Sequence, residues 1–212
     1  MKILYTTSGP VSTNGFLIYD ENTLDGVIID APIGSFDFFI GEIEKKHINL
    51  NAIWLSHSHW DHTGDANKIH KFTKKPIYIH PLDEYRMIDP NKYLGFQLPF
   101  EIEPCFADAF FEENQILKVG NLEFELMLTP GHTEGSICFV NHLHKTVIVG
   151  DVLFKGSIGR TDLLGGNFEV LIESIRTKLL VLDDDFKVFN GHGDSTTIGN
   201  EKMFNPFLRD LN

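Results

Sequence analysis

Residues 56–62 read Ser-His-Ser-His-Trp-Asp-His, so three histidines and one aspartate stand within seven positions of the chain. The stretch follows directly on the apolar run at residues 52–55, which is typical of a buried β-strand. Side chains two positions apart in an extended backbone point to the same side, so His57 and His59 can bind the same ion. Asp61 and His62 stand where the next helical pattern begins, and a turn there directs them to a second position. Core packing gives no reason for this spacing, and the stretch therefore predicts a metal site on a loop between a strand and a helix.

A zinc ion usually takes four donors, so two ions need ligands from elsewhere in the chain. Three candidates each end an apolar segment beside glycine, namely His132 after Thr-Pro-Gly, Asp151 after Val-Ile-Val-Gly, and His192 after Asn-Gly. Strand ends beside glycine are places where a sheet presents side chains to a crevice. The predicted first ion is bound by His57, His59 and His132, and the second by Asp61, His62 and His192. Asp151 bridges the two because a carboxylate has two oxygens, and a shared water completes the predicted site. The expected ions are divalent, most simply zinc, with iron or manganese as alternatives.

The other five histidines stand alone in the sequence, and we expect them to be core or surface residues rather than ligands. They are His47, His70, His80, His142 and His144.

The composition indicates one compact domain over residues 1–212, because a chain of 212 residues that is 42% hydrophobic can bury a substantial core. The formal net charge of −12 argues against nucleic acid and anionic membranes as partners, since both attract basic surfaces.

No apolar run approaches the roughly 20 residues that span a bilayer, and the first residues lack the pattern of a signal peptide, so a cytoplasmic protein is expected. Cys105 and Cys138 lie in apolar contexts and are predicted to be buried free thiols.

Apolar runs bounded by turn residues predict strands at residues 2–6, 15–19, 26–30, 52–55, 76–79, 122–128, 136–140 and 146–149. Helical spacing predicts helices at residues 35–47, 64–72 and 167–182, the last of them capped by Asn167. The early strands come as a run and the later ones are separated by helices, which favours a layered α/β or α+β sandwich over a βαβ repeat. Residues 89–109 are the least regular stretch and are interpreted as a long surface excursion that forms either a lid or the rim of a site.

With these residues in place, the chain resembles the metallo-β-lactamase-fold hydrolases, whose signature is His-x-His-x-Asp-His followed by separate histidine, aspartate and histidine ligands. The resemblance covers nearly the whole chain. Residues 129–136, 150–162 and 191–201 look like the corresponding stretches of the small bacterial glyoxalase II-type proteins. The resemblance implies an α+β fold, a four-layer αββα sandwich with a dinuclear centre on one edge of the inner sheets. It also implies hydrolysis of thioesters of the S-lactoylglutathione kind.

The charges of the predicted site suit hydrolysis of an anionic small molecule by a metal-bound hydroxide. Two divalent ions carry four positive charges, and Asp61, Asp151 and a hydroxide remove three of them. Because a thiolate leaves readily, Asp61 is needed only as a ligand that orients the hydroxide.

Arg160 is a candidate for binding a substrate carboxylate, and its alternative role is an ion pair with Asp162. Thr133, Ser136 and Asp194 are either partners of ligand imidazoles or simple turn residues.

Other functions of the same fold remain open at this stage. The persulfide dioxygenases share the Gly-Arg-Thr-Asp stretch at residues 159–162 but use one iron, held by residues that match His57, His132 and Asp151; the pair Gly165-Gly166 favours the hydrolase. A lactonase or another hydrolase is a further alternative, and the negative charge argues against a nuclease. A non-catalytic metal-binding module is disfavoured because structural zinc sites are usually rich in cysteine.

Full-length glyoxalase II enzymes carry a helical C-terminal extension that contacts glutathione, whereas this sequence stops soon after His192. The thiol, the acyl group, the native metal and the oligomeric state are left open.

Overall fold

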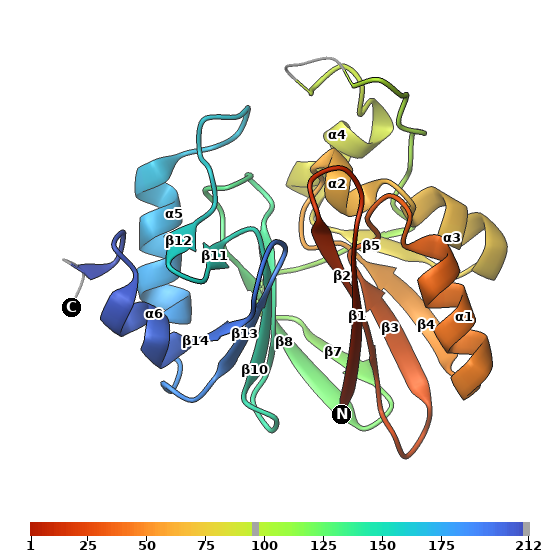
Figure 1. The fold of residues 1–212 in the computed structure, drawn as a ribbon, viewed down its shortest axis with the longest axis horizontal. Coiled ribbons are helices and arrows are strands. Elements are labelled where there is room, and N and C mark those ends of the chain that lie inside the picture. The colour runs from red at the N-terminus through yellow and green to blue at the C-terminus, as the bar shows by residue number, and fades with distance from the viewer. Residues whose placement is uncertain (95–97, 210–212) are drawn as a thin grey trace. The chain divides into compact units, whose positions relative to one another are not determined.

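The computed structural model describes residues 1–94 and 98–209. These residues form two compact units: Met1–Phe111 with Lys118–Glu123, and Glu112–Leu117 with Phe124–Asn212. Each unit contains a six-stranded sheet and its own helices (Figure 1). A sheet with covering helices in each unit supplies the components of the predicted αββα sandwich. The single domain over residues 1–212 stays a prediction.

The sheet of the first unit has the strand order β1-β2-β3-β4-β5-β6. Its strands are β1 (Lys2–Ser8), β2 (Thr13–Tyr19), β3 (Asp25–Ile29), β4 (Asn49–Trp54), β5 (Ile77–Ile79) and β6 (Ala109–Phe110). The first three pair antiparallel, whereas β3 to β6 run parallel to one another. Parallel neighbours end at the same edge of a sheet. The residues that follow β3, β4 and β5 are therefore brought to one edge.

Helices join the parallel strands of this sheet, as parallel pairing requires. They are α1 (Phe36–Lys46), α2 (Trp60–Thr63), α3 (Ala66–Thr73), the 3-10 turn η1 (Pro81–Asp83) and α4 (Glu84–Ile88). Phe39 of α1 and Ile69 of α3 are fully buried in one core with Ile28, Ile53 and Ile79 of the strands. These two helices therefore cover one face of the sheet (Figure 1).

The second unit contains a sheet of order β14-β13-β10-β9-β8-β7 and a two-stranded ribbon, β11-β12. The strands are β7 (Ile116–Val119), β8 (Leu122–Leu128), β9 (Ile137–Asn141), β10 (Thr146–Gly150), β11 (Leu153–Phe154), β12 (Ser157–Ile158), β13 (Lys187–Asn190) and β14 (Thr196–Thr197). Strand β9 is antiparallel to both β8 and β10, and β10 is parallel to β13. It follows that β8, β10 and β13 share one direction and end at the same edge.

Two helical segments complete this unit: α5 (Phe168–Ser174), which continues as the π-helical turn η2 (Ile175–Leu179), and α6 (Ile198–Phe204). Leu171, Ile175 and Leu179 pack with the valines of β10 and β13. The predicted cap is confirmed, because the Asn167 side chain accepts a hydrogen bond of 3.0 Å from the Val170 N–H.

The eight predicted strands and three predicted helices are all present, with ends displaced by a few residues. The elements that the patterns missed are the short ones, β6, β11, β12, β14 and the one-turn helices, which offer too few residues for a period to show. Strands β7 and β13 and helix α6 were missed as well. Residues 89–108 contain no helix or strand in their described part, as predicted, while residues 95–97 of that excursion lie outside the described residues. None of the helices within residues 1–94 and 98–209 is long and apolar enough to cross a membrane.

Candidate metal centre

The four predicted ligands of the first unit follow β4 closely: His57 and His59 lie on the loop before α2, and Asp61 and His62 lie within α2. His57, Asp61 and His62 are buried and His59 is half-buried. The His57 ring lies 4.9 Å from that of His59 and 4.2 Å from that of His62, measured between centroids. Asp61 Oδ2 lies 3.5 Å from His62 Nε2. Two donors at 2.0 to 2.1 Å from a tetrahedral ion are about 3.3 Å apart, so Asp61 and His62 have the spacing of ligands to one ion.

Asp30, which the sequence patterns did not single out, orients this loop. Its Oδ2 lies 2.8 Å from His62 Nδ1 and accepts a hydrogen bond of 2.7 Å from Ser56 Oγ, and its Oδ1 accepts one of 2.8 Å from the Ser56 N–H. A carboxylate beside Nδ1 holds the imidazole proton there and leaves the Nε2 lone pair for a metal. The missed signal was local, because Asp30 ends the predicted strand at residues 26–30 much as Asp151 ends its apolar segment.

Asp61 is held from a different strand. Thr13, the first residue of β2, donates a hydrogen bond of 2.7 Å from its hydroxyl to Asp61 Oδ2. Because a donor to the carboxylate favours its ionised form, Asp61 is suited to bind a cation.

The three predicted ligands of the second unit follow β8, β10 and β13, whose ends share one edge. Asp151 Oδ2 lies 3.7 Å from His132 Nε2 and 3.3 Å from His192 Nε2. His132 Nδ1 donates to the Arg160 carbonyl oxygen over 2.8 Å, which again leaves Nε2 for a metal. Asp151 thus stands beside both histidines, as its predicted bridging role requires.

Two glycines allow the backbone to approach closely around these ligands. A Cβ on Gly159 would lie 1.9 Å from the Asp151 carbonyl oxygen and 3.1 Å from His132 Nδ1. Gly131, with φ of +126°, precedes His132, and a Cβ there would lie 2.2 Å from the Leu171 nitrogen. Any larger residue at either position would displace the backbone that carries a predicted ligand.

Arg160 pairs with Asp162, which is the structural alternative that the sequence left open. Its Nε and one terminal nitrogen each donate to a different oxygen of Asp162 over 2.7 Å. This hydrogen-bonded ion pair raises the pKa of Arg160 and lowers that of the Asp162 carboxyl to about 2. Both side chains are exposed, so the pair contributes little stability.

The polar residues near the ligands make two kinds of contact. The Thr133 and Ser136 hydroxyls lie 2.7 Å apart, and Ser136 Oγ also accepts from the Thr133 N–H over 3.1 Å, so these two residues contact each other within one turn. Asp194 accepts a hydrogen bond of 3.1 Å from Lys155, which is 39 residues away.

The histidines and cysteines that were predicted not to bind metal make other contacts or are buried. His70 Nδ1 lies 2.9 Å from the Lys75 carbonyl oxygen, and His142 Nε2 lies 2.6 Å from Glu125. Cys105 and Cys138 are buried free thiols, as predicted, and burial raises the pKa of each to about 12.

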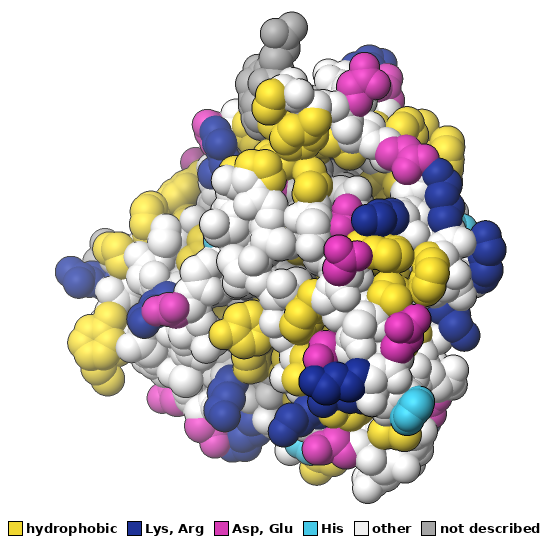
Figure 2. Space-filling model, turned by 45° about the vertical axis from the view of Figure 1, so that its right-hand side comes forward, with side chains coloured by type: hydrophobic (Ala, Val, Ile, Leu, Met, Phe, Trp, Pro, Cys, Tyr) yellow, Lys and Arg dark blue, Asp and Glu magenta, His cyan; other side chains and the backbone are white. Residues whose placement is uncertain are grey.

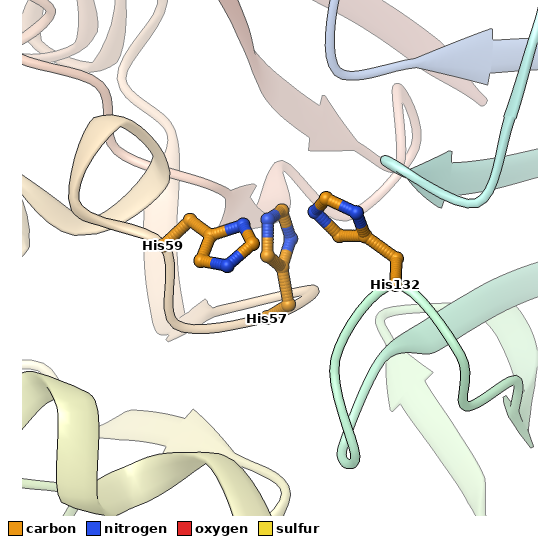
Figure 3. A group of neighbouring side chains, drawn as sticks. All are labelled: His57, His59 and His132. Atoms are coloured by element: carbon orange, nitrogen blue, oxygen red, sulfur yellow. The ribbon is translucent and has the colours of Figure 1, made fainter. Parts of the chain in front are cut away.

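The donor set of each unit suits divalent cations. The first unit offers three imidazoles and a carboxylate, and the second offers two imidazoles and a carboxylate, which are ligand types that zinc, iron and manganese accept. Figure 3 draws His57 and His59, from the loop after β4, and His132, from the loop after β8. The candidate ligands, all histidine or aspartate, are of the types found in hydrolytic metal centres, because structural zinc sites are richer in cysteine.

Comparison with known proteins identifies the family. Residues 8–192 match the model of the metallo-beta-lactamase superfamily, and the chain belongs to this superfamily. It is 42% identical to hydroxyacylglutathione hydrolase GloC of Haemophilus influenzae, over 92% of each chain. Among solved structures, it is similar to the BLEG-1 B3 metallo-beta-lactamase (TM-score 0.89, 32% identity, 98% of this chain and 100% of that one). It is also similar to TTHA1623 in a di-iron-bound form (TM-score 0.85, 30% identity, 97% of this chain and 100% of that one).

These findings confirm the predicted fold class, an α+β fold of the metallo-β-lactamase type. They also establish the coarser part of the functional prediction, that the protein is a metallohydrolase of this fold that uses divalent metal ions.

Proposed function

We propose that this protein hydrolyses thioesters of the S-lactoylglutathione kind, as glyoxalase II enzymes do. The observation that carries the proposal is the 42% identity to a hydroxyacylglutathione hydrolase, which extends over 92% of both chains. The proposal is also supported by the seven candidate ligands, because all of them are histidine or aspartate.

The proposed centre contains two divalent ions. His57, His59 and His132 would bind one ion, Asp61, His62 and His192 would bind the other, and Asp151 would contribute to both. Zinc is the metal proposed here, and iron is the chief alternative because a protein of 30% identity has been solved with two irons. Bound ions of this kind lower the pKa of water to about 7 and polarise a carbonyl group.

The chain itself would orient the ligands and the substrate. Asp30 and the Arg160 carbonyl would hold the Nδ1 sides of His62 and His132, so that Nε2 of each ring is the atom that can face a metal. Asp61 would act as a ligand and would orient the attacking water, since a thiolate leaves without help from a strong acid.

Arg160 is proposed to bind a carboxylate of the substrate. Because its guanidinium is already bonded to Asp162, it would have to use its remaining N–H groups or exchange partners. Substitution of Arg160 by alanine should then raise KM several-fold with little change in kcat. An unchanged KM would assign Arg160 to the pair with Asp162 alone.

A small anionic substrate agrees with the charge of the proposed centre. The face in Figure 2 carries Lys and Arg side chains scattered among Asp and Glu, which does not favour nucleic acid on that face. Activity should fall below about pH 6, because histidines with pKa values near 6.5 must be neutral to bind a metal. A pH–rate profile that stays flat down to pH 4 would contradict this.

The test combines metal analysis of protein purified without chelator with assays on a panel of glutathione thioesters. We expect about two zinc ions per chain and thioester cleavage that is lost with chelator. Replacing His132 by alanine should reduce kcat/KM more than about 100-fold, since partners of metal ligands alone are worth about 10- to 100-fold. The matched control is His142→Ala, which removes an exposed histidine paired with Glu125 and should keep wild-type activity. Iron content with oxygen consumption on a glutathione persulfide, and no thioester cleavage, would overturn the proposal in favour of the dioxygenase.

A further inference from the structure

We propose that Asp83 is a positioning residue of the metal centre. It holds the loop at Ser58, the residue between His57 and His59, so that both imidazoles are oriented before an ion arrives. The inference rests on the proposed function in one respect, that these two histidines are ligands.

The first observation is that Asp83 meets the hydrogen-bonding needs of the loop at this point. Residues 56–59 belong to no helix or strand, and the N–H groups of Ser56 and Ser58 donate to side-chain carboxylates instead of to a neighbouring strand. Ser58 is 2% exposed, and its N–H and hydroxyl both donate to Asp83 Oδ2, over 2.9 and 3.0 Å. Burial of an N–H without an acceptor is unfavourable, so this carboxylate determines where the Ser58 backbone can lie.

Serine and histidine alternate in the motif, and this alternation explains how the Ser58–Asp83 contact can orient the histidines. In an extended backbone, residues 56 and 58 share one side and residues 57 and 59 share the other. Ser56 donates to the buried Asp30, and Ser58 donates to the buried Asp83. Two carboxylates therefore anchor alternate residues of the loop, so that His57 lies between the two anchored serines and His59 directly follows the second.

Asp83 is itself held by a buried cation. Arg86 is 4% exposed, and its Nη1 lies 3.3 Å from Asp83 Oδ1 and 3.5 Å from Ser58 Oγ. The Arg86 guanidinium also stacks over the Tyr85 ring at 4.5 Å. A buried ion pair often contributes little net stability, because desolvation of both charges offsets their attraction. Its effect here is geometric, since Arg86 occupies one oxygen of Asp83 and leaves the other directed at Ser58.

The topology explains how a residue 25 positions away reaches the loop. Strands β4 and β5 are parallel neighbours, so the loop after β4 and the η1 turn after β5 emerge at the same edge of the sheet. Asp83 is the last residue of η1, where the chain enters α4. The contact thus joins two segments that follow neighbouring strands of one sheet, and preorganised ligands are best supported by such elements.

The experiment measures zinc affinity by competition with a chromophoric chelator, and the spectrum of the cobalt-substituted protein, for Asp83→Asn and wild type. An asparagine at this position can present only one acceptor oxygen, so either Ser58 or Arg86 then faces an amide NH₂. We expect zinc affinity to fall about 10- to 100-fold, the range for loss of a group that orients metal ligands. The cobalt spectrum should change as well, because it reports the geometry around the ion.

The matched control is Asp20→Asn, another buried carboxylate of the first unit. Asp20 accepts hydrogen bonds from the backbones of Asn22 and Asn121 and from the Asn121 side chain, at 2.7 to 2.9 Å. This variant should lose stability and keep wild-type zinc affinity and cobalt spectrum. Should Asp83→Asn fail to fold, Ser58→Ala removes only the hydroxyl contact and is expected to weaken zinc binding several-fold.

The outcomes separate this inference from the proposed function. Wild-type zinc affinity in both Asp83→Asn and Ser58→Ala, or an equal loss in Asp20→Asn, overturns the positioning role and leaves thioester hydrolysis intact. Weaker zinc binding in a protein that cleaves none of the thioesters supports the positioning role and overturns the proposed substrate. A wild-type protein that binds no metal overturns both.

Discussion

The replacement of Asp30 by asparagine should lower the free energy of unfolding by about 1.5 to 3 kcal/mol. Asp30 Oδ2 contacts both Ser56 Oγ and His62 Nδ1, whereas Oδ1 accepts only from the Ser56 N–H. The single oxygen of asparagine is best placed at the Oδ2 position, where it keeps two contacts. The Ser56 N–H then faces an amide NH₂, and one hydrogen bond to a charged group is lost.

The loss of stability in Asp30→Asn can be assigned to the side chain, because the backbone conformation at residue 30 suits asparagine as well as aspartate. Its φ is +59°, in the left-handed region, which asparagine tolerates about as well as aspartate. Alanine at this position would leave three buried donors without an acceptor, at about 1 to 3 kcal/mol each, and would add about 1 to 2 kcal/mol of backbone strain. That sum approaches the roughly 5 to 15 kcal/mol by which a domain is stable. Asp30→Ala should therefore fail to accumulate as folded protein.

The assay is urea unfolding of chelator-treated protein, followed by circular dichroism, so that bound metal adds nothing to the difference. The control is Asp25→Asn, an exposed carboxylate of the same strand region that accepts a hydrogen bond of 2.7 Å from Asn49. It should unfold within about 0.5 kcal/mol of wild type. A loss below about 0.5 kcal/mol for Asp30→Asn, or an equal loss for both variants, would refute the reasoning.

Three further predictions come from the second unit and the cysteines. Gly159→Ala should lower both the thermal midpoint and zinc affinity, because its Cβ would lie 1.9 Å from a backbone carbonyl oxygen; a wild-type melting curve would contradict this. Cys105 and Cys138, with pKa values of about 12, should resist iodoacetamide at pH 8 in the folded protein and react after denaturation, and rapid native labelling would show that burial is incomplete. The Asp162 carboxyl has its pKa lowered from 3.8 to about 2, so its contribution to stability is present above about pH 4 and is lost as pH falls through about 2. In an NMR titration of Arg160→Gln, the pKa of the Asp162 carboxyl should return toward 3.8. If the pKa of Asp162 does not change in this variant, the ion pair with Arg160 is not the cause of the lowered pKa.

The residues predicted as ligands could be found from the sequence because their signals are local. Three histidines and an aspartate in a seven-residue stretch cannot be separated by folding, since the chain joins them. His132, Asp151 and His192 carried a weaker signal, a strand end beside glycine, and the parallel directions of β8, β10 and β13 confirm that their strands end at one edge.

The residues that orient the ligands gave weaker signals or none. Asp30 could have been suspected, because a buried strand that ends in aspartate resembles the one that ends at Asp151. Asp83 lies in a polar stretch, Pro-Leu-Asp-Glu, that reads as an ordinary turn. The contact of Arg160 with Asp162 was anticipated as one of two roles, and its two-residue separation made that pairing easy to foresee.

By itself, the sequence determined which side chains can donate to a metal, the approximate course of the strands and the superfamily. Chain connectivity and hydrophobic periodicity act over a few residues, and both can be read without a structure. Only the tertiary structure decided that Asp30 lies against His62, 32 residues away, and that Asp83 lies against Ser58, 25 residues away. Such contacts depend on which strands become parallel neighbours in a sheet, and that choice follows from the packing of the whole sheet and its helices rather than from any local pattern.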